Sequence, residues 1–180
     1  MKKTAKDVVD FWVDAGPERW FQGGAAFDAQ CRDNFYELHM AAARGELAGW
    51  AENTEGALAL ILLLDQMPRN IFRGNAHAYA TDPLALSVAR QAIEDGHDKK
   101  YDIALRSFFY LPFMHSEALA DQERCVALFS VIPESSSGTW AVHHCEIIRR
   151  FGRFPHRNHL LGRTTTAEEH TWLEEGGFQG

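Results

Sequence analysis

Apolar positions recur at helical spacing along most of this 180-residue chain. The clearest stripe has steps of four, four, three and four residues and consists of Phe27, Cys31, Phe35, Leu38 and Ala42. Such steps place side chains on one face of an α-helix, whereas a half-buried strand would alternate strictly between apolar and polar residues. No convincing alternation of that kind occurs, so the sequence predicts an all-α fold.

Residues 57–64 form a run of eight apolar side chains without a polar face. A helix that is apolar on all sides is buried, so we expect this one at the centre of the fold. Thr54 and Glu55 predict its capped start, and Asp65 and Gln66 follow its last apolar residue. Asp65 is then a carboxylate near the end of a buried helix, where both burial and the helix dipole disfavour its charge.

Capping side chains, glycines and prolines divide the chain into seven or eight helices joined by short connections. We expect helix starts at Thr4, Thr54, Asp82, Ser116 and Thr166, and further helices over about residues 101–111 and 139–151. Residues 133–138 contain three serines and are predicted to form a loop. Short connections favour antiparallel packing, either as a closed bundle or as a curved, TPR-like superhelix, and the periodicity is compatible with both.

The length of the chain suits one domain of ordinary size, so we expect residues 1–180 to form a single all-helical domain. Its longest apolar run is far shorter than the roughly 20 residues that a membrane-spanning helix needs. The cysteines, Cys31, Cys125 and Cys145, are odd in number and include no C-x-x-C pair, which favours a reducing compartment. We therefore expect a soluble, cytoplasmic protein.

Charge excludes two classes of partner and suggests a third. The chain has 18 basic and 25 acidic side chains and a formal charge of −7, so we expect neither nucleic acid nor a membrane as a partner. The lysines are confined to residues 2–6 and 99–100, whereas residues 149–163 contain five arginines, two histidines and no acid. Because the planar guanidinium suits carboxylate and phosphate, this segment predicts an anion site. Equally, its phenylalanines can fill the core while its arginines satisfy helix carbonyls.

Two stretches with the pattern Arg-Asn-x-x-x-Gly, each with a proline just ahead, occur within residues 68–74 and 155–162, where apolar helices are expected to end. At such an end, Arg and Asn side chains either satisfy unpaired carbonyls or reach into a cleft between helices. Asp65 needs a cation, for which Arg69 is the local candidate and the arginine-rich segment the distant one. We expect the two stretches to meet in space, as a structural clamp or as a ligand site.

A further group of polar residues crowds the start of the sixth expected helix. His115 precedes the cap, Glu117 lies in the first turn, and Asp121 lies on the same face one turn later. An imidazole with two carboxylates can transfer protons or bind a metal, but acids at a helix start also complement the helix dipole. The adjacent His143 and His144 point about 100 degrees apart on a helix, so we expect no metal site, and no motif indicates a cofactor.

Motifs along nearly the whole chain carry a family resemblance. They are Asp-Gln-Met-Pro-Arg-Asn at 65–70, Asp-Pro-Leu-Ala at 82–85, His-Ser-Glu at 115–117, Asp-Gln-Glu at 121–123 and Arg-Phe-Gly-Arg-Phe-Pro-His-Arg-Asn at 150–158. Together they resemble the bacterial DUF924 family, which implies an all-helical fold of the TPR-like superhelical kind and no established biochemical activity. Met67, Glu146 and Ala167 depart mildly from the family pattern without threatening the fold.

Two hypotheses for the function follow. In the first, the polar motifs converge on a cleft for a small anionic ligand, such as a phosphorylated one. The candidate ligand-binding residues are Asp65, Arg69, Asn70, Arg73, Asp121, Arg153, Arg157 and Asn158, and the candidates for proton transfer are His115, Glu117 and His156. In the second, a TPR-like helical module binds a protein or peptide and catalyses nothing. The sequence determines neither a reaction nor an oligomeric state.

Overall fold

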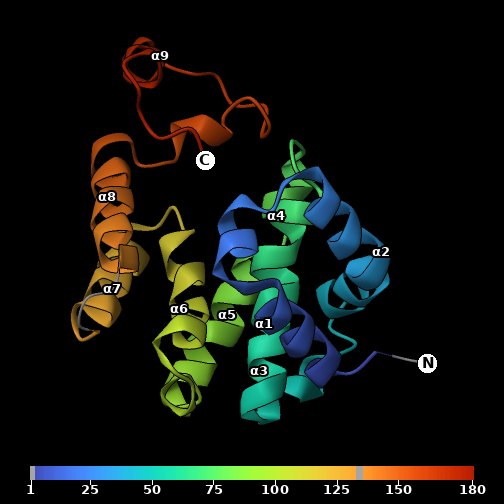
Figure 1. Cartoon of the computed structure of the whole chain (residues 1–180). Coiled ribbons are helices and arrows are strands. Elements are labelled where there is room, and N and C mark those ends of the chain that lie inside the picture. The colour runs from blue at the N-terminus through green and yellow to red at the C-terminus, as the bar shows by residue number, and fades with distance from the viewer. Residues whose placement is uncertain (1–2, 133–135) are drawn as a thin grey trace. The chain divides into compact units, whose positions relative to one another are not determined.

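The computed structural model describes residues 3–132 and 136–180, and these residues form helices and turns without a strand (Figure 1). The predicted all-α fold is therefore confirmed. The α-helices are α1 (Ala5–Gln22), α2 (Gly24–Ala43), α3 (Thr54–Ile61), α4 (Met67–Ile71), α5 (Asp82–Glu94), α6 (Ile103–Met114), α7 (Leu119–Ser130), α8 (Ser136–Phe151) and α9 (Ala167–Glu174). The shorter helical segments are η1 (Ala48–Glu52), η2 (Leu62–Gln66), η3 (Ala76–Tyr79), η4 (Asp98–Lys100) and η5 (Pro155–Arg157). Within the described residues, no helix has both the length and the apolar character required to cross a membrane.

The chain divides into two compact units, unit 1 (Met1–Pro112) and unit 2 (Phe113–Gly180). Helix α6 contributes residues to both of them. The expectation of a single domain over residues 1–180 is not tested by this division, because compact units of one chain can still belong to one domain. The TPR-like arrangement of the helices also stays a prediction.

The centre of unit 1 is the buried helix that the sequence predicted. Segments α3, η2 and α4 follow one another directly, with α1 and α5 packed against α3 and α2 packed against α4. Each side chain from 57 to 64 is at most 3% exposed. The predicted stripe of α2 is also buried, from Phe27 through to Ala42. Apolar burial of this kind is the main term that favours folding.

The predicted starts of the first and last helices are confirmed in detail. Thr4 and Asp7 form a capping box at α1, and Thr166 and Glu169 form another at α9. In each box the threonine side chain accepts from the backbone of the acid, and the acid accepts from the backbone of the threonine. Helix α1 kinks at Gly16, whose φ of +73° favours glycine, and Pro17 follows directly. The chain then resumes a helical course.

Three predicted caps were wrong by one or two residues. The N-caps are Asn53, Thr81 and Ala118, in place of Thr54, Asp82 and Ser116. The side chains that were expected to cap form bonds to other side chains instead: Thr54 to His97, Asp82 to Arg69 and Ser116 to Asp121. Local capping preference is worth only about 1 kcal/mol, so tertiary partners of this kind can redirect it.

Two other predicted boundaries also differ. Helix α6 continues through Pro112, which was expected to end it, because packing of the buried Phe108 and Phe109 outweighs the lost backbone bond. Helix α8 begins at Ser136, so the last part of the loop predicted over 133–138 is helical. Residues 133–135 of that loop lie outside the described residues.

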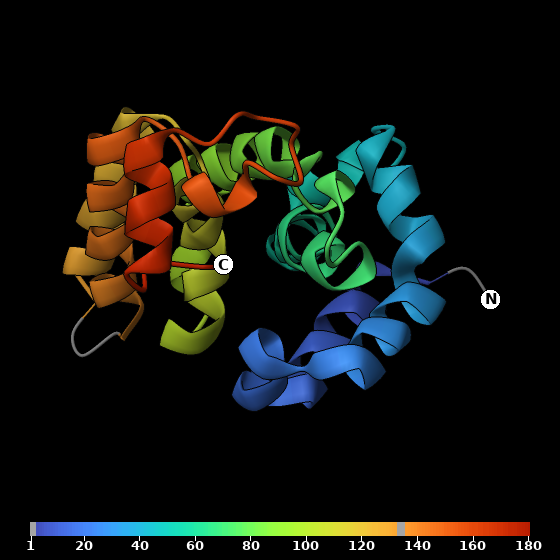
Figure 2. The ribbon, with the colours of Figure 1, turned by 90° about the horizontal axis from the view of Figure 1, so that it is seen from above.

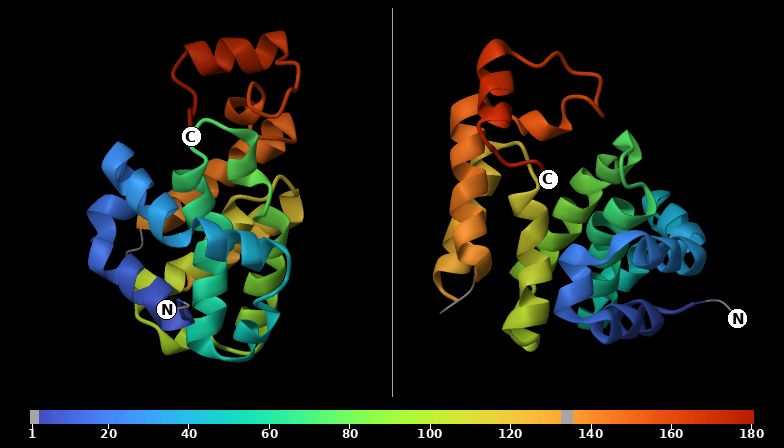
Figure 3. Two further views of the ribbon diagram at one scale, coloured as in Figure 1. Left: turned by 90° about the vertical axis from the view of Figure 1, so that its right-hand side faces the viewer. Right: turned by 45° about the horizontal axis from the view of Figure 1, so that its top comes forward.

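Unit 2 is built on α7 and α8, which lie side by side (Figures 1 and 2). Helix α9 lies beyond the end of α8 and contacts η5 (Figure 3). A small core of Ile147, Ile148 and Phe154 joins these elements, with Trp172 and Phe178 packed against it. The arginine-rich segment therefore runs from the end of α8, through η5, to the start of α9.

Candidate functional site

Asp65, the carboxylate that the sequence predicted to need a cation, is fully buried and lies beside Arg69. An Arg69 Nη1 atom is 3.4 Å from Asp65 Oδ1, and the same guanidinium donates to both carboxylate oxygens of Asp82 at 2.9 and 3.0 Å. Arg69 also donates to the backbone carbonyl of Asp65. Burial opposes the charge of Arg69, but the two carboxylates outweigh it and raise the pKa of Arg69. One arginine thus binds two carboxylates.

The backbone around Asp65 is the π-helical segment η2. A π turn leaves some carbonyls without their usual intrahelical partner. Here His39 Nδ1 lies 2.8 Å from the carbonyl oxygen of Leu63, and the Thr81 hydroxyl donates to the carbonyl of Leu64 at 2.6 Å. These contacts join α2 and the start of α5 to the central helix. The carbonyls of the widened π-helical turn therefore have a structural role.

Asn70 and Arg73, the other predicted residues of this corner, are also bonded within unit 1. Arg73 donates to both oxygens of Asp28 at 2.6 and 2.9 Å and to Asn70 Oδ1 at 3.2 Å. Asn70 Nδ2 donates to the carbonyl of Gln66 at 3.3 Å. Both arginines of the corner, Arg69 and Arg73, are therefore bound to carboxylates of unit 1. This arrangement favours the structural clamp over an anion site at this corner.

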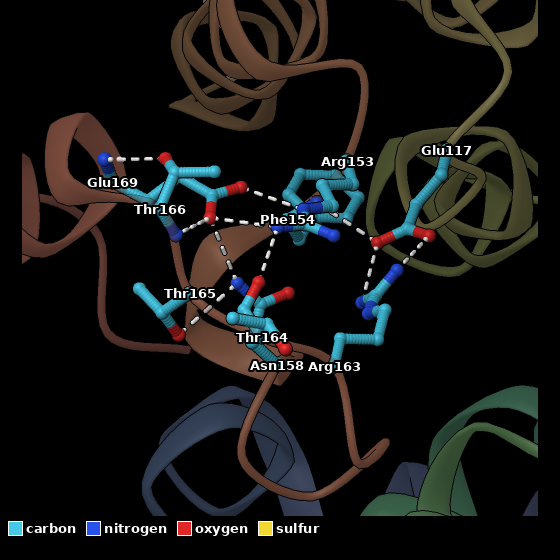
Figure 4. A network of polar contacts seen from close by, with 9 residues as sticks. All are labelled: Glu117, Arg153, Phe154, Asn158, Arg163, Thr164, Thr165, Thr166 and Glu169. Atoms are coloured by element: carbon cyan, nitrogen blue, oxygen red, sulfur yellow. Dashed lines mark hydrogen bonds and ion pairs between the residues drawn. The ribbon is translucent and has the colours of Figure 1, made fainter.

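Glu117 lies between α6 and α7 and holds the arginine-rich segment of unit 2 (Figure 4). Its carboxylate accepts two bonds from Arg163, at 2.8 and 3.0 Å, and one from the backbone N–H of Phe154 at 2.8 Å. Burial raises the pKa of Glu117, but the bonds from Arg163 and Phe154 outweigh it, so the pKa lies below its usual value. Glu117 is therefore an ionised acceptor at neutral pH.

A second carboxylate, Glu169 of α9, holds the same segment from another element. It accepts from Arg153 at 2.6 and 2.8 Å, from Asn158 Nδ2 at 3.2 Å and from the backbone of Thr166 at 2.8 Å. The bonds from Arg153, more than any other cause, lower the pKa of Glu169 to about 2. Figure 4 shows Glu169 and Glu117 on opposite sides of Arg153. The two carboxylates thus fix the segment between α8 and α9.

Arg157 is a buried cation of η5 in unit 2. Its guanidinium stacks over the ring of Phe154 at 4.5 Å from the ring centroid, and the residue is only 6% exposed. The charge of Arg157 contributes to the lowered pKa of Glu117 and to that of His144. A buried cation is therefore within electrostatic range of both a carboxylate and an imidazole.

His144 is a member of this group that the sequence did not predict. Its Nδ1 lies 2.8 Å from the carbonyl oxygen of Trp140. Burial lowers the pKa of His144 to about 4, and the nearby His115, His143 and Arg157 add to the shift. Because a carbonyl only accepts, Nδ1 carries the hydrogen, and the neutral ring presents Nε2 as an acceptor.

The sequence did contain one signal for His144. It lies on the buried face of α8 with Ala141, Cys145 and Ile148, all of which are nearly inaccessible. A polar side chain at helical spacing within an apolar face marks either a satisfied core group or a functional one. The adjacent His143 gives the same stretch the look of a paired-histidine metal motif.

The three residues predicted to transfer protons, His115, Glu117 and His156, all belong to unit 2. His115 lies close enough to His144 for its charge to lower the pKa of that ring. His156 immediately precedes Arg157 in η5. Sequence positions from 115 to 157 are thus brought into one unit around α8, and their roles in proton transfer stay predictions.

Asp121, a predicted ligand-binding residue, serves the turn that leads into α7. It accepts a hydrogen bond from the Ser116 hydroxyl at 2.7 Å. The neighbouring Gln122 Nε2 donates to the carbonyls of Met114 and Ser116 at 2.7 and 2.6 Å. These bonds satisfy backbone groups at the end of α6, and a ligand contact by Asp121 stays a prediction.

The two Arg-Asn-x-x-x-Gly stretches lie in different units, residues 68–74 in unit 1 and residues 155–162 in unit 2. The expectation that they meet in space is therefore not tested. In the part of the chain that the structure describes, no group of three or more His, Cys, Asp or Glu side chains is arranged to hold a metal ion. A surface hollow on α2 is lined by residues that the sequence did not predict: Arg32, Asp33, Asn34, Tyr36 and Glu37.

Known proteins share both the sequence and the fold. A family model described as a bacterial protein of unknown function (DUF924) matches residues 8–177, which confirms the resemblance seen in the motifs. A solved structure of a protein of unknown function from Agrobacterium tumefaciens is 54% identical in sequence, with a TM-score of 0.93. The match covers 96% of this chain and 97% of that chain. None of the curated proteins compared with the chain matches it.

Proposed function

The chain belongs to the DUF924 family of bacterial proteins of unknown function, and we propose that unit 2 binds a small anionic ligand at Arg157. One observation carries this proposal: Arg157 is a cation that is only 6% exposed, and its guanidinium lies over the ring of Phe154 at 4.5 Å from the ring centroid. Buried charges grouped with titratable side chains of perturbed pKa are typical of functional sites.

The stacking of Arg157 supports recognition of a phosphate or carboxylate. Contact with the ring of Phe154 fixes the plane of the guanidinium, and its N–H donors all lie in that plane. The two acids of the segment are each paired with another arginine, Glu117 with Arg163 and Glu169 with Arg153. Their negative charges are therefore largely compensated, which lowers the repulsion that an anion beside Arg157 would meet.

The surrounding groups suit acid and base steps on a bound anion. The ionised Glu117 and the neutral His144 both offer acceptor atoms, while His115 and His156 have side chains that can donate or accept. Such a set supports proton transfer next to a held phosphate or carboxylate. We propose these residues as candidates without assigning a reaction class.

The proposal is tested by replacing the planar guanidinium of Arg157 while keeping the positive charge. In Arg157→Lys, we expect the affinity for inorganic phosphate, measured by isothermal titration calorimetry, to fall by about tenfold or more, because lysine lacks the planar pair of donors. The matched control is Arg150→Lys, at an exposed arginine of the same segment that pairs with Glu168. Wild-type protein that does not bind phosphate at millimolar concentration, or equal affinities in the two variants, would contradict the proposal.

A second candidate function is the binding of a protein or peptide partner by the helices of unit 2. The observation in its favour is the exposure of large apolar side chains there, 74% for Val131 and 51% for Trp140. Scattered apolar residues are common on protein surfaces, so this observation weighs less than the charged group around Arg157. Analytical ultracentrifugation of the wild type and of Trp140→Ser tests for self-association. Pull-down experiments with the same two proteins as bait test for other partners.

We also propose a cytoplasmic location. All three cysteines, Cys31, Cys125 and Cys145, are free and buried. Burial raises the pKa of Cys31 and of Cys125 to about 12, which keeps these thiols protonated and unreactive. Free thiols suit a reducing compartment, and fractionation of the cells that make the protein tests this expectation.

A further inference from the structure

The segment that follows α9 returns to the imidazoles of the proposed site. Its ring, Phe178, makes edge contacts with His144 and His156 at centroid distances of 4.7 and 5.0 Å. The same ring lies 5.9 Å from that of Trp140 and 6.0 Å from that of His143. One phenylalanine therefore contacts two imidazoles of the proposed site, His144 in α8 and His156 in η5.

Two glycines let the chain make this return. Gly176 has a φ of +92°, a conformation that other residues rarely adopt. At Gly177 a Cβ atom would lie 2.5 Å from Cδ2 of Trp172, so the backbone passes directly over that ring. The backbone N–H of Gly177 also donates to the carbonyl of Trp172 at 2.9 Å. These residues form a turn from which the following residues extend.

The attachment of this segment is light. Gln179 Nε2 donates to the carbonyls of Leu173 and Gly177, at 3.0 and 2.8 Å, and these belong to the end of α9 and to the turn itself. Phe178 is only partly buried, and Gln179 is exposed. The segment is held by the ring contacts of Phe178 and by the local bonds of Gln179, and a short segment held by one partly buried ring opens at a fraction of the free energy of global unfolding.

We propose that residues 175–180 are a strap that closes over His144 and His156 through Phe178 and opens to admit the anionic ligand. The regulation of the site in this way rests on the proposed function. The backbone turns at Gly176 and Gly177, and the ring contacts of Phe178 hold the strap closed. Ligand binding and strap closure compete, so removing the ring contacts of Phe178 strengthens binding of the anion.

The closed strap also accounts for the dry environment of His144. Burial is the main cause that lowers the pKa of this ring, and the charges of His115, His143 and Arg157 contribute further. Opening the strap lets water reach the imidazole while leaving those charges in place. The pKa of His144 should then rise toward the ordinary value of 6.5.

The test uses the full chain with Phe178→Ala. In NMR titrations of the imidazole signals, we expect the pKa of His144 to rise by about one unit or more, because desolvation is relieved. Gly177→Ala should act in the same direction by an independent route, since its Cβ would collide with Trp172. The matched control is Arg150→Lys, at an exposed arginine outside the strap that pairs with Glu168. Equal His144 pKa values in Phe178→Ala, Arg150→Lys and wild type would overturn the strap.

Phosphate binding by the same variants separates the strap from the site. The aromatic contacts of Phe178 are together worth at least about 1.4 kcal/mol, so Phe178→Ala should bind inorganic phosphate at least about tenfold more tightly than wild type. If Arg157→Lys loses phosphate affinity but Phe178→Ala does not gain any, the strap is refuted and the anion site is retained. If the pKa of His144 rises in Phe178→Ala but the phosphate affinity of Arg157→Lys equals that of wild type, the proposed function is refuted. That outcome would still show that Phe178 covers the ring of His144.

Discussion

The two arginine-asparagine corners of the molecule start from the same sequence pattern and form different environments. In unit 1, Arg69 lies between the buried Asp65 and the carboxylate of Asp82. In unit 2, Arg157 stacks on Phe154 and acts on groups that titrate. The pattern Arg-Asn-x-x-x-Gly thus predicts a corner where a helix ends, but not what the corner does.

The difference lies in the partners that the fold supplies. Around Arg69 the carboxylates of Asp65 and Asp82 both contact the guanidinium, so an anion at this place would meet their repulsion. The segment of Arg157 has its acids paired with separate arginines and brings imidazoles close by. Unit 1 therefore uses its arginine to compensate a buried charge, and unit 2 has the groups for a ligand.

The largest expected effect is at the corner of unit 1. Arg69→Met removes the cation beside the fully buried Asp65, and we expect a loss of about 3–5 kcal/mol in the free energy of unfolding. Urea unfolding followed by circular dichroism measures it. The control is Arg44→Met, which removes an exposed pair with Glu46 and should change the free energy of unfolding far less. A loss at Arg69 as small as that of the control would remove the contrast between the corners.

An intermediate effect is expected from the carboxylate that fixes the segment in unit 2. Because the folded pKa of Glu169 is about 2, below its ordinary 4.5, its stabilisation is fully present above pH 4.5 and is lost as the pH falls through about 2. Glu169→Gln should cost about 2 kcal/mol at pH 7 and weaken the pH dependence of stability between those values. Urea midpoints measured from pH 2 to pH 7 show whether the variant has the flatter profile. Parallel profiles for variant and wild type would mean that Glu169 does not carry this dependence.

A small effect is expected at the exposed edge of the unit 1 corner. Arg73 pairs with Asp28, but its side chain is 59% exposed, so water and salt screen the interaction. Arg73→Ala should lower the free energy of unfolding by roughly 0.5 kcal/mol, and by less in 1 M salt. Thermal melts at low and high ionic strength measure this. A cost that matches that of Arg69→Met would show that the whole corner acts as one network.

Much of the fold, but less of the site, was predictable from the sequence. The apolar run of residues 57–64 and the capping box of Thr166 depend on neighbours in the chain, so periodicity and spacing revealed them. The bond of Thr54 to His97, and the bonds of His39 and Thr81 to carbonyls of the π-helical segment η2, depend on contacts with other elements. Local preference cannot supply those contacts, because they come from residues far away in the sequence.

The same distinction holds for the candidate site. His115, Glu117, His156 and Arg157 were predicted from their chemistry, and the structure places them in one unit. The pair of Arg69 with Asp82 spans 13 residues, and that of Glu117 with Arg163 spans 46. Such pairing decides which carboxylate each of these arginines binds. It follows from packing rather than from composition.

The central claim is that the unit 2 corner, and not the unit 1 corner, binds an anion. It is tested most directly by titrating inorganic phosphate into the wild-type protein at constant pH and following the imidazole signals by NMR. We expect saturable shifts for His115, His144 and His156, with no change for His39 and His77, which lie near the other corner. Saturable shifts for His39 and His77 with none for the unit 2 imidazoles, or no saturable shift at any histidine, would contradict it.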